Sequence, residues 1–192
     1  MCLKSSINGL THPGCQTSLS LDGLFSAVVY KGIIKKMIYQ FKYSPYLTGL
    51  EEIIGTLSYE GLIQNESFMR IVSPNVLLIP VPLHKSREIK RGYNHASLIA
   101  KQVEKHFGLK EKSVLIRTKN TKPQYKLLKE ERRKNIQGAF IVNEKYKGLI
   151  KGRPIFLVDD IATTCSTLKE CGKVLKKNGA KKVYGLTFAK EY

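Results

Sequence analysis

Short, almost continuous apolar runs recur along the chain from residue 75 onward. Residues 75–82 (NVLLIPVP) and 154–158 (PIFLV) have this form, which is typical of strands buried on both faces of a parallel sheet. Residues 183–189 predict a further strand, and residues 114–117 and 139–142 predict two brief ones. We therefore expect a sheet of several strands in this part of the chain.

Between these runs, apolar residues recur at helical intervals. They line one face of residues 96–107, where Gly108 follows as a stop signal, and one face of residues 167–177. Residues 30–43 and 51–62 predict two more helices, the first with lysines between its apolar positions. Because strands and helices alternate, the sequence predicts an α/β fold with a mainly parallel, Rossmann-like sheet flanked by helices.

The beginning of the chain has a different character. Residues 1–21 lack periodicity and are rich in Gly, Ser, Thr, Pro and Cys, so something other than a core must hold them. We expect three parts: a small irregular module at 1–21, a helical hood at 22–70 and the α/β domain at 71–192. A length of 192 residues fits one complete core rather than two sizeable domains.

The formal charge of +18 is large for this length and indicates a polyanionic partner: a phosphorylated small molecule, nucleic acid or an anionic membrane surface. A lysine-rich surface that only confers solubility is the alternative. No apolar run approaches the roughly 18 residues of a membrane span, and no signal pattern opens the chain. We therefore expect a cytoplasmic protein, whose four cysteines are reduced thiols and not a disulfide framework.

The strongest candidate for chemistry is the segment 156–168, FLVDDIATTCSTL. A buried strand delivers Asp159 and Asp160 to its carboxyl end, where carboxylates can accept hydrogen bonds from vicinal sugar hydroxyls. A hydroxyl-rich turn then opens a helix, whose unpaired N–H groups and positive dipole end suit a phosphate. The side chains of this turn are Thr163, Thr164, Cys165, Ser166 and Thr167. An acidic strand end with a threonine helix cap is the plainer alternative.

This segment resembles the phosphoribosyl-pyrophosphate (PRPP) motif of type I phosphoribosyltransferases, in which two acidic residues and a Thr-Thr-Gly-like turn follow a hydrophobic strand. The resemblance implies that Asp159 and Asp160 serve catalysis and that residues 159–167 bind PRPP with Mg²⁺. Cys165 stands at the usual glycine, where a side chain can crowd the phosphate. A small residue tolerated in a tight turn is favoured over a nucleophilic thiol, for which no partner is evident. Cys171, inside an apolar stripe, is expected in the core.

A second block, residues 80–96 (PVPLHKSREIKRGYNHA), sets a basic loop directly after a buried strand. Cations there suit a pyrophosphate or a phosphodiester backbone, and a solvated basic loop is the alternative. Proteins of the ComF family carry such a Pro-Val-Pro-Leu strand end, spaced arginines and an Arg-Gly-aromatic-Asn tetrad, which this block resembles. His95 stands where their pattern usually has Gln. The predicted contacts are Lys85, Arg87, Lys90, Arg91 and Asn94.

A third block follows the spacing of the ComF family from a flexible loop into the next strand: Leu115, Arg117, Gln124, Leu128, Arg132, Asn135, Gly138, Ala139 and Phe140. In phosphoribosyltransferases the corresponding mobile segment closes over PRPP and excludes water. The resemblance therefore implies a lid that includes Arg117, Gln124, Arg132 and Asn135. An exposed basic helix over residues 122–134 is the alternative.

Cys2, His12 and Cys15 are the residue types of a zinc site, and His12 and Cys15 have knuckle spacing. ComF relatives often begin with a four-ligand zinc ribbon, and residues 21–43 are also similar to theirs. In that comparison the partner of Cys2 falls before residue 1, which implies a truncated or degenerate zinc-ribbon-like module at 1–21. If zinc binds there, it folds a module that has no core of its own.

Two functions fit these observations. The first is a PRPP-dependent transferase, in which Mg²⁺ and the basic segments support the departing pyrophosphate. The second, implied by the ComF family's association with DNA uptake, is a competence factor that handles single-stranded DNA together with other competence proteins. There the cations of residues 85–91 and 117–134 follow the phosphate backbone, and Tyr93 and Tyr125 stack on bases. A phosphoribosyl site could also regulate such a surface.

Overall fold

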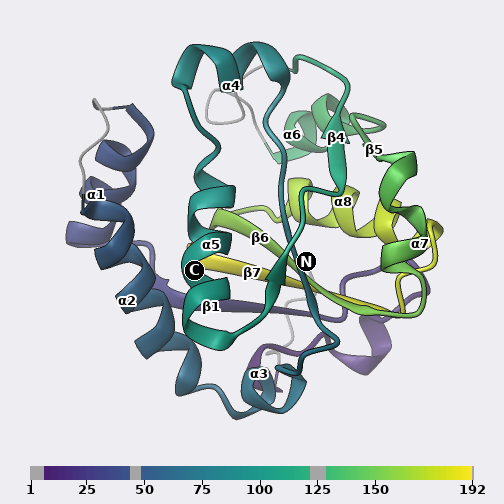
Figure 1. The fold of residues 1–192 in the computed structure, drawn as a ribbon, viewed down its shortest axis with the longest axis horizontal. Coiled ribbons are helices and arrows are strands. Elements are labelled where there is room, and N and C mark those ends of the chain that lie inside the picture. The colour runs from purple at the N-terminus through teal and green to yellow at the C-terminus, as the bar shows by residue number, and fades with distance from the viewer. Residues whose placement is uncertain (1–6, 44–48, 122–128, 192) are drawn as a thin grey trace.

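Five parallel strands form the central sheet of the protein (Figure 1). The structure is a computed structural model and describes residues 7–43, 49–121 and 129–191. In spatial order the strands are β1 (Gly23–Val29), β7 (Lys182–Lys190), β6 (Pro154–Ala162), β2 (Leu77–Pro80) and β3 (Lys110–Glu111). The register places Leu78 opposite Phe156, and Phe156 opposite Tyr184. The prediction of an α/β fold with a parallel sheet is confirmed.

Helices cover both faces of this sheet (Figure 1). One face carries α1 (Gly32–Tyr43), α2 (Leu50–Ile63), α3 (Glu66–Ile71) and α5 (His95–Phe107). The other carries α6 (Lys129–Ile136), α7 (Lys147–Ile150), α8 (Ser166–Lys177) and a separate antiparallel pair, β4 (Leu115–Arg117) and β5 (Phe140–Val142). No helix in these ranges is long and apolar enough to cross a membrane.

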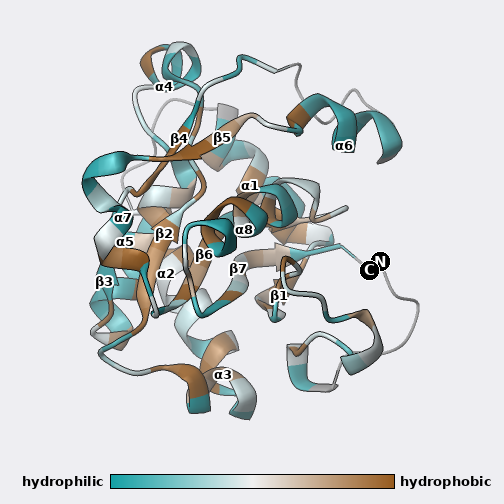
Figure 2. Ribbon diagram, turned by 90° about the vertical axis from the view of Figure 1, so that its right-hand side faces the viewer, coloured by the Kyte–Doolittle hydropathy of each residue, from teal (hydrophilic) through white to brown (hydrophobic). Residues whose placement is uncertain are grey.

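Successive residues of the central strands alternate between two hydrophobic cores. In β6, Ile155 and Leu157 point into the core under α8, whereas Phe156 and Val158 point into the core under α2 and α5. All four side chains are fully buried, which explains why the run shows no polar alternation in the sequence. Figure 2 shows the contrast between these apolar strands and the hydrophilic helix α6 at the margin of the molecule.

β1 is a strand that the sequence analysis did not predict. It lies within the range assigned to the hood, yet it pairs in parallel with β7 from Gly23 to Val29 and forms one edge of the main sheet. Ser26 and Ala27 interrupt its apolar pattern, and Ser26 Oγ lies 2.7 Å from Thr187 Oγ1 of β7. The range 22–70 therefore contributes a strand as well as the helices α1 to α3.

The basic segment after β2 is a helix and not the loop that its charges suggested. α4 spans Lys85–Arg91 and stands beyond the end of the sheet (Figure 1). His84 caps its N-terminus, where Nδ1 accepts a hydrogen bond from Ser86 N at 3.3 Å. Gly92 ends it in the left-handed conformation, with φ at 81°. These two caps give a short, charged segment a defined shape.

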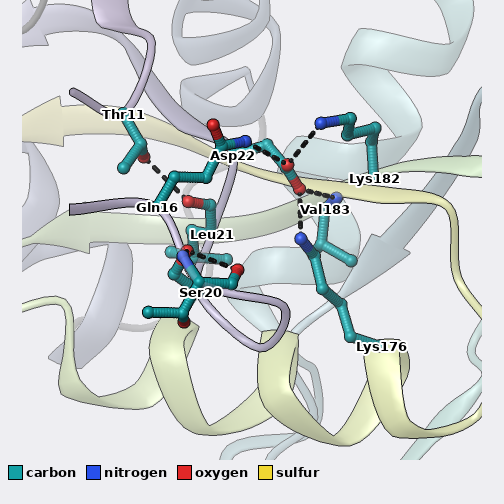
Figure 3. A network of polar contacts seen from close by, with 9 residues as sticks. Thr11, Gln16, Ser20, Leu21, Asp22, Lys176, Lys182 and Val183 are labelled. Carbon is teal, nitrogen blue, oxygen red and sulfur yellow. Dashed lines mark hydrogen bonds and ion pairs between the residues drawn. The ribbon is translucent and has the colours of Figure 1, made fainter. Parts of the chain in front are cut away.

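Asp22 ties the N-terminal module to the α/β domain (Figure 3). Its buried carboxylate forms ion pairs with Lys176 at 2.7 Å and Lys182 at 3.1 Å, and accepts a hydrogen bond from Val183 N at 2.8 Å. Gln16 Nε2 donates to the same carboxylate at 3.2 Å. A module without a core of its own is thus held by polar contacts around one buried charge.

Burial alone would raise the pKa of Asp22. The hydrogen bonds from Lys176, Val183 and Lys182, together with the charge of Lys176, outweigh it, so the pKa is lowered below its ordinary value. Asp22 is therefore a structural acid that stays ionised.

Candidate ligand site at the carboxyl edge of the sheet

The carboxyl ends of β2 and β6 form a topological switch point. The two strands are neighbours, but the chain leaves β2 through α5 to β3 and leaves β6 through α8 to β7. α5 and α8 pack on opposite faces of the sheet. Ligands of open α/β sheets bind in the crevice that such a reversal leaves, so this edge is where the predicted site residues should meet.

Asp159 and Asp160 lie at this edge, near the end of β6. The strand continues to Ala162, four residues beyond the predicted end, and its alternation turns the two carboxylates to opposite faces. Asp160 Oδ2 forms an ion pair with Lys42 Nζ of α1 at 2.8 Å. Asp159 Oδ1 accepts a hydrogen bond from Asp160 N at 2.9 Å.

The two carboxylates differ in electrostatic environment. Burial, followed by the negative charge of Asp160, raises the pKa of Asp159 to about 7, against the opposing effects of Lys42, the Asp160 N–H and Arg117. A carboxyl group that titrates near neutral pH is typical of functional sites.

The turn that follows β6 gathers hydroxyl groups at the N-terminus of α8. Thr163, Thr164, Ser166 and Thr167 are all partly exposed, and Thr164 Oγ1 lies 2.9 Å from Ser166 Oγ. α8 runs for 12 residues, so its first N–H groups and its dipole end face the same turn as the hydroxyls. The arrangement suits a phosphate group.

Cys165 occupies this turn in a backbone conformation that favours glycine. Its φ is 55° and its ψ is 16°, and it is the N-cap residue of α8. The interpretation of Cys165 as a small residue tolerated in a tight turn agrees with this geometry. Its side chain is buried, and burial raises the pKa of the thiol, which argues against thiolate chemistry. Cys171 is fully buried in the core, as predicted.

Two arginines converge on Thr121. Arg87 Nη2 of α4 donates to the backbone carbonyl of Thr121, and Arg117 Nη2 of β4 donates to its hydroxyl. Arg117 lies at the end of a strand and is 8% exposed, so its placement in a flexible loop is corrected. Its guanidinium carbon lies 5.4 Å from the centre of the Phe140 ring.

The buried guanidinium of Arg117 has only some of its hydrogen-bond donors satisfied. Burial, followed by the charge of Arg87, lowers its pKa, and Asp159 acts in the opposite direction. Within the described ranges, its buried Nε has no hydrogen-bond partner. A buried donor beside a second guanidinium favours an anionic ligand.

The remaining residues of the second block divide into two groups. Lys85 and Lys90 are exposed on α4, and Arg91 is partly buried. Asn94 has a structural part: its Oδ1 accepts from Ala96 N at 3.1 Å as the cap of α5, and its Nδ2 donates to Val81 O at 3.0 Å. Asn94 therefore fixes the beginning of α5 against the end of β2.

The predicted lid reaches the turn through α6. Arg132 Nη1 donates to Thr163 Oγ1 at 3.2 Å, so a residue of this segment contacts the hydroxyl turn. Asn135 is partly buried on the same helix. Gln124 and Tyr125 lie outside the described residues.

Sequence reasoning missed the residues that α1 and α5 bring to the site. Besides Lys42, His95 is 3% exposed and packs its ring 5.0 Å from the rings of both Phe41 and Tyr93. Burial is the main reason that its pKa is lowered to about 4, so the imidazole is neutral at pH 7. Tyr93 donates to Phe41 O at 3.1 Å and is packed within this cluster. Nothing in the sequence distinguishes Lys42 from its neighbouring lysines.

The zinc prediction remains a prediction. His12 Nδ1 accepts from Gly14 N at 3.2 Å as the cap of a short 3₁₀ helix, Pro13–Cys15, and Cys15 is partly exposed. Cys2 lies outside the described residues. Within 7–43, 49–121 and 129–191, no group of three or more His, Cys, Asp or Glu side chains could hold a metal ion.

Fold and site together define an α/β protein in which two aspartates and a turn rich in hydroxyl groups lie at the switch point between β2 and β6. Arginine side chains lie near these groups. The chain is 37% identical over 115 residues to Competence protein F of Haemophilus influenzae, a match that covers 58% of this chain and 50% of the relative. Competence protein ComFC of Bacillus subtilis is 30% identical over 163 residues, covering 84% and 61%. DNA utilization protein YhgH of Escherichia coli K12 is 30% identical over 104 residues, covering 54% and 44%.

These similarities support the ComF family assignment that the sequence motifs indicate. No family model matches the chain. The chain spans about half the length of the first curated relatives that it matches.

Proposed function

We propose that this ComF-family chain binds PRPP, or a related 5-phosphoribosyl ligand, together with Mg²⁺ at the carboxyl edge of β2 and β6. One observation carries the proposal. The acidic pair Asp159–Asp160 and the hydroxyl turn lie in one strand, turn and helix, and the buried guanidinium of Arg117 lies near Asp159. Carboxylates, a phosphate cradle and cations thus lie at the same carboxyl edge of the sheet.

Each part of the ligand has a partner in this arrangement. The ribose hydroxyls donate to the carboxylates of Asp159 and Asp160, and the 5-phosphate accepts from the N–H groups and hydroxyls at the beginning of α8. The pyrophosphate lies toward Arg117 and Arg87, where it accepts a hydrogen bond from the buried Nε of Arg117, which has no partner among the described residues. Arg132, which already donates to Thr163, covers the turn.

Magnesium fits the site only together with the ligand. Two carboxylates offer the hard oxygen atoms that Mg²⁺ prefers, and ligand phosphates commonly complete such a shell. Asp159 and Asp160 are the residues that would contribute to holding the ion, which would neutralise charge on the pyrophosphate.

Transfer of the phosphoribosyl group is the reaction that such a complex permits. The bond between the anomeric carbon and the pyrophosphate oxygen breaks, its electron pair leaves with the pyrophosphate, and an acceptor nucleophile bonds to the carbon. Arg87 and Arg117 stabilise the leaving group, and the carboxylates stabilise positive charge on the sugar.

A part in DNA uptake is the second component of the proposal. The printed names of the relatives refer to competence and to DNA utilization, and the net charge of +18 favours a polyanionic partner. The exposed lysines of α4 at the end of the sheet offer contacts for a DNA backbone. This component concerns the exposed lysines of α4, whereas the phosphoribosyl ligand is proposed to contact Arg87 of the same helix.

Calorimetric titration with PRPP and Mg²⁺ tests the ligand. We expect the intact protein to bind and Asp160→Asn to weaken binding at least tenfold, because the neutral amide accepts more weakly from the hydroxyls. Glu60→Gln, at an exposed position of α2, is the matched control and should bind as the unaltered protein does. Absence of heat with the intact protein would overturn the proposal.

A further inference from the structure

Lys42 places a cation from the hood directly on the acidic pair. Its ammonium nitrogen lies 2.8 Å from Asp160 Oδ2, and the side chains are only 23% and 14% exposed. An ion pair shielded to this degree is weakened less by salt and solvent than a surface pair. Within the described part of the chain, no other ion pair reaches Asp159 or Asp160.

The end of α1 is fixed where this contact is made. Phe41, next to Lys42, is 4% exposed and packs its ring 5.0 Å from the ring of His95 at the beginning of α5. The backbone carbonyl of Phe41 accepts from Tyr93 Oη at 3.1 Å. The packed aromatic cluster therefore fixes the backbone of α1 next to Lys42 and places the lysine beside Asp160.

The charged groups around Asp159 and Asp160 distinguish Lys42 from the other cations near the site. Asp159 and Asp160 repel each other, and burial favours a proton on Asp159. From α5, His95 faces the pair as a neutral ring. Arg91 of α4 acts on His95, and Arg117 of β4 acts on Asp159, both as longer-range charges. Lys42 of α1 is the cation in direct contact.

We propose that Lys42 is a positioning residue of the ligand site: its ammonium group fixes the orientation of the Asp160 carboxylate and couples α1 to ligand binding. This inference rests on the proposed phosphoribosyl function for the identity of the ligand. Asp160 keeps its second oxygen, Oδ1, for the ligand while Oδ2 stays on Lys42.

The test compares three variants of α1. Lys42→Gln removes the charge from the site, Lys42→Arg keeps it, and Lys36→Gln removes the same charge from an exposed position of the same helix. Affinity for PRPP with Mg²⁺ is measured by calorimetry at one fixed pH. The carboxyl carbon resonance of Asp160 is compared by NMR among the ligand-free proteins at the same pH, and thermal unfolding confirms that each variant folds.

We expect Lys42→Gln to weaken binding about tenfold, equivalent to about 1.4 kcal/mol, because the Asp160 carboxylate loses the ammonium group that fixes it. The carboxyl carbon resonance of Asp160 should shift for the same reason. Lys42→Arg should retain most of the affinity, and Lys36→Gln should change neither quantity.

Each other outcome decides against the inference in a distinguishable way. Tighter binding by Lys42→Gln would mean that the lysine competes with the ligand. Equal affinity in Lys42→Gln and Lys36→Gln would remove Lys42 from the site. Failure of the intact protein to bind PRPP would overturn the proposed function and the ligand part of this inference. An unmoved carboxyl carbon resonance of Asp160 in Lys42→Gln would overturn the part that concerns Asp160, whatever the ligand.

Discussion

The Nη1 atom of Arg132 donates a hydrogen bond to the Thr163 hydroxyl across 3.2 Å. This contact joins α6, from the segment predicted as a lid, to the first hydroxyl of the turn that ends β6. A guanidinium group this close to a phosphate cradle adds to the affinity for an anionic ligand.

We predict that Arg132→Gln weakens PRPP binding about tenfold, because charge-assisted hydrogen bonds to phosphate are worth about 1.5–3 kcal/mol. Arg133→Gln is the control, since Arg133 is the exposed neighbour on the same helix. The two affinities are compared by calorimetry. Equal losses in both variants would show that only the total charge of α6 matters.

The raised pKa of Asp159 predicts that this candidate site residue lowers the free energy of unfolding at high pH. The folded protein keeps the proton on this group up to about pH 7, whereas an unfolded chain loses it near pH 4. Folding therefore retains a proton, and the stabilising contribution of this group is complete below about pH 4 and lost as pH rises through 7.

Asp159→Asn should thus be more stable than the unaltered protein at pH 8, by about 2 kcal/mol after a discount for the partly exposed carboxyl group. The difference in stability between the variant and the unaltered protein should be smaller at pH 5, because the raised pKa of Asp159 destabilises the folded protein less there. Urea unfolding at both pH values measures it. A variant less stable at pH 8 would show that the pKa of Asp159 is not raised in the folded state.

The conformation of Cys165 predicts an inverted order of two small substitutions. In most positions Ala is more stabilising than Gly, but at a φ of 55° an L side chain costs about 1–2 kcal/mol. Cys165→Gly should therefore be more stable than Cys165→Ala by about 1 kcal/mol. Both variants lose the sulfur, so the comparison isolates the effect of the Cβ atom.

Thermal or urea unfolding of the two variants provides the measurement. Cys165→Gly should also bind PRPP more tightly than Cys165→Ala, because a phosphate approaches bare backbone more closely. If Ala proves the more stable, the left-handed conformation of this residue is not strained.

The contacts of Asp22 predict a large stability effect far from the candidate ligand site. Asp22→Asn leaves Lys176, whose side chain is 8% exposed, without its partner, and breaking a buried pair from one side costs about 3–5 kcal/mol. Lys182→Gln is the comparison: the side chain of Lys182 is 44% exposed, and such pairs contribute about 1 kcal/mol or less.

The pKa of Asp22 is lowered, so its stabilising contribution is present above the unfolded pKa of about 4 and is lost as pH falls below that. The difference between Asp22→Asn and the unaltered protein should therefore shrink below pH 4. Urea unfolding across this range measures it. A difference that stays constant in acid would mean that the carboxylate charge is not the source of the stability.

Local patterns revealed the parts of the fold whose residues are neighbours in sequence. The strand β6, the acidic pair and the beginning of α8 are one continuous segment, so their order was enough to predict a ligand edge. β1 was missed because what fixes it is the pairing with β7, as in the contact between Ser26 and Thr187, 161 positions apart. α4 was predicted as a loop because its many charges were given more weight than the helix caps at His84 and Gly92.

The site residues also divide into those that a local sequence motif reveals and those that only tertiary contacts bring to the site. Asp159, Asp160 and the hydroxyl turn could be found by motif, but Lys42 arrives from α1, and only the packing of Phe41 against His95 brings it there. The burial of Arg117 depends likewise on β5, which lays Phe140 beside it. A residue type and a spacing cannot reveal a contact that tertiary packing creates.

The proposed part in DNA uptake assigns contacts with DNA to the exposed lysines of α4. Lys85 and Lys90 are exposed at the end of the sheet, and Lys85 also lines a small cavity together with Arg117. Binding of single-stranded DNA through such contacts weakens with salt, with a slope of about 0.7 per phosphate contact.

The double variant Lys85→Gln with Lys90→Gln should weaken DNA binding and lower this salt slope by about 1.4, because two phosphate contacts are lost. Lys101→Gln with Lys105→Gln is the matched control, since both lysines are exposed on α5 and the charge change is the same. Fluorescence anisotropy with a labelled oligonucleotide at several salt concentrations gives both slopes. Equal salt slopes in the two double variants would show that DNA senses the overall charge of the protein and not the surface of α4.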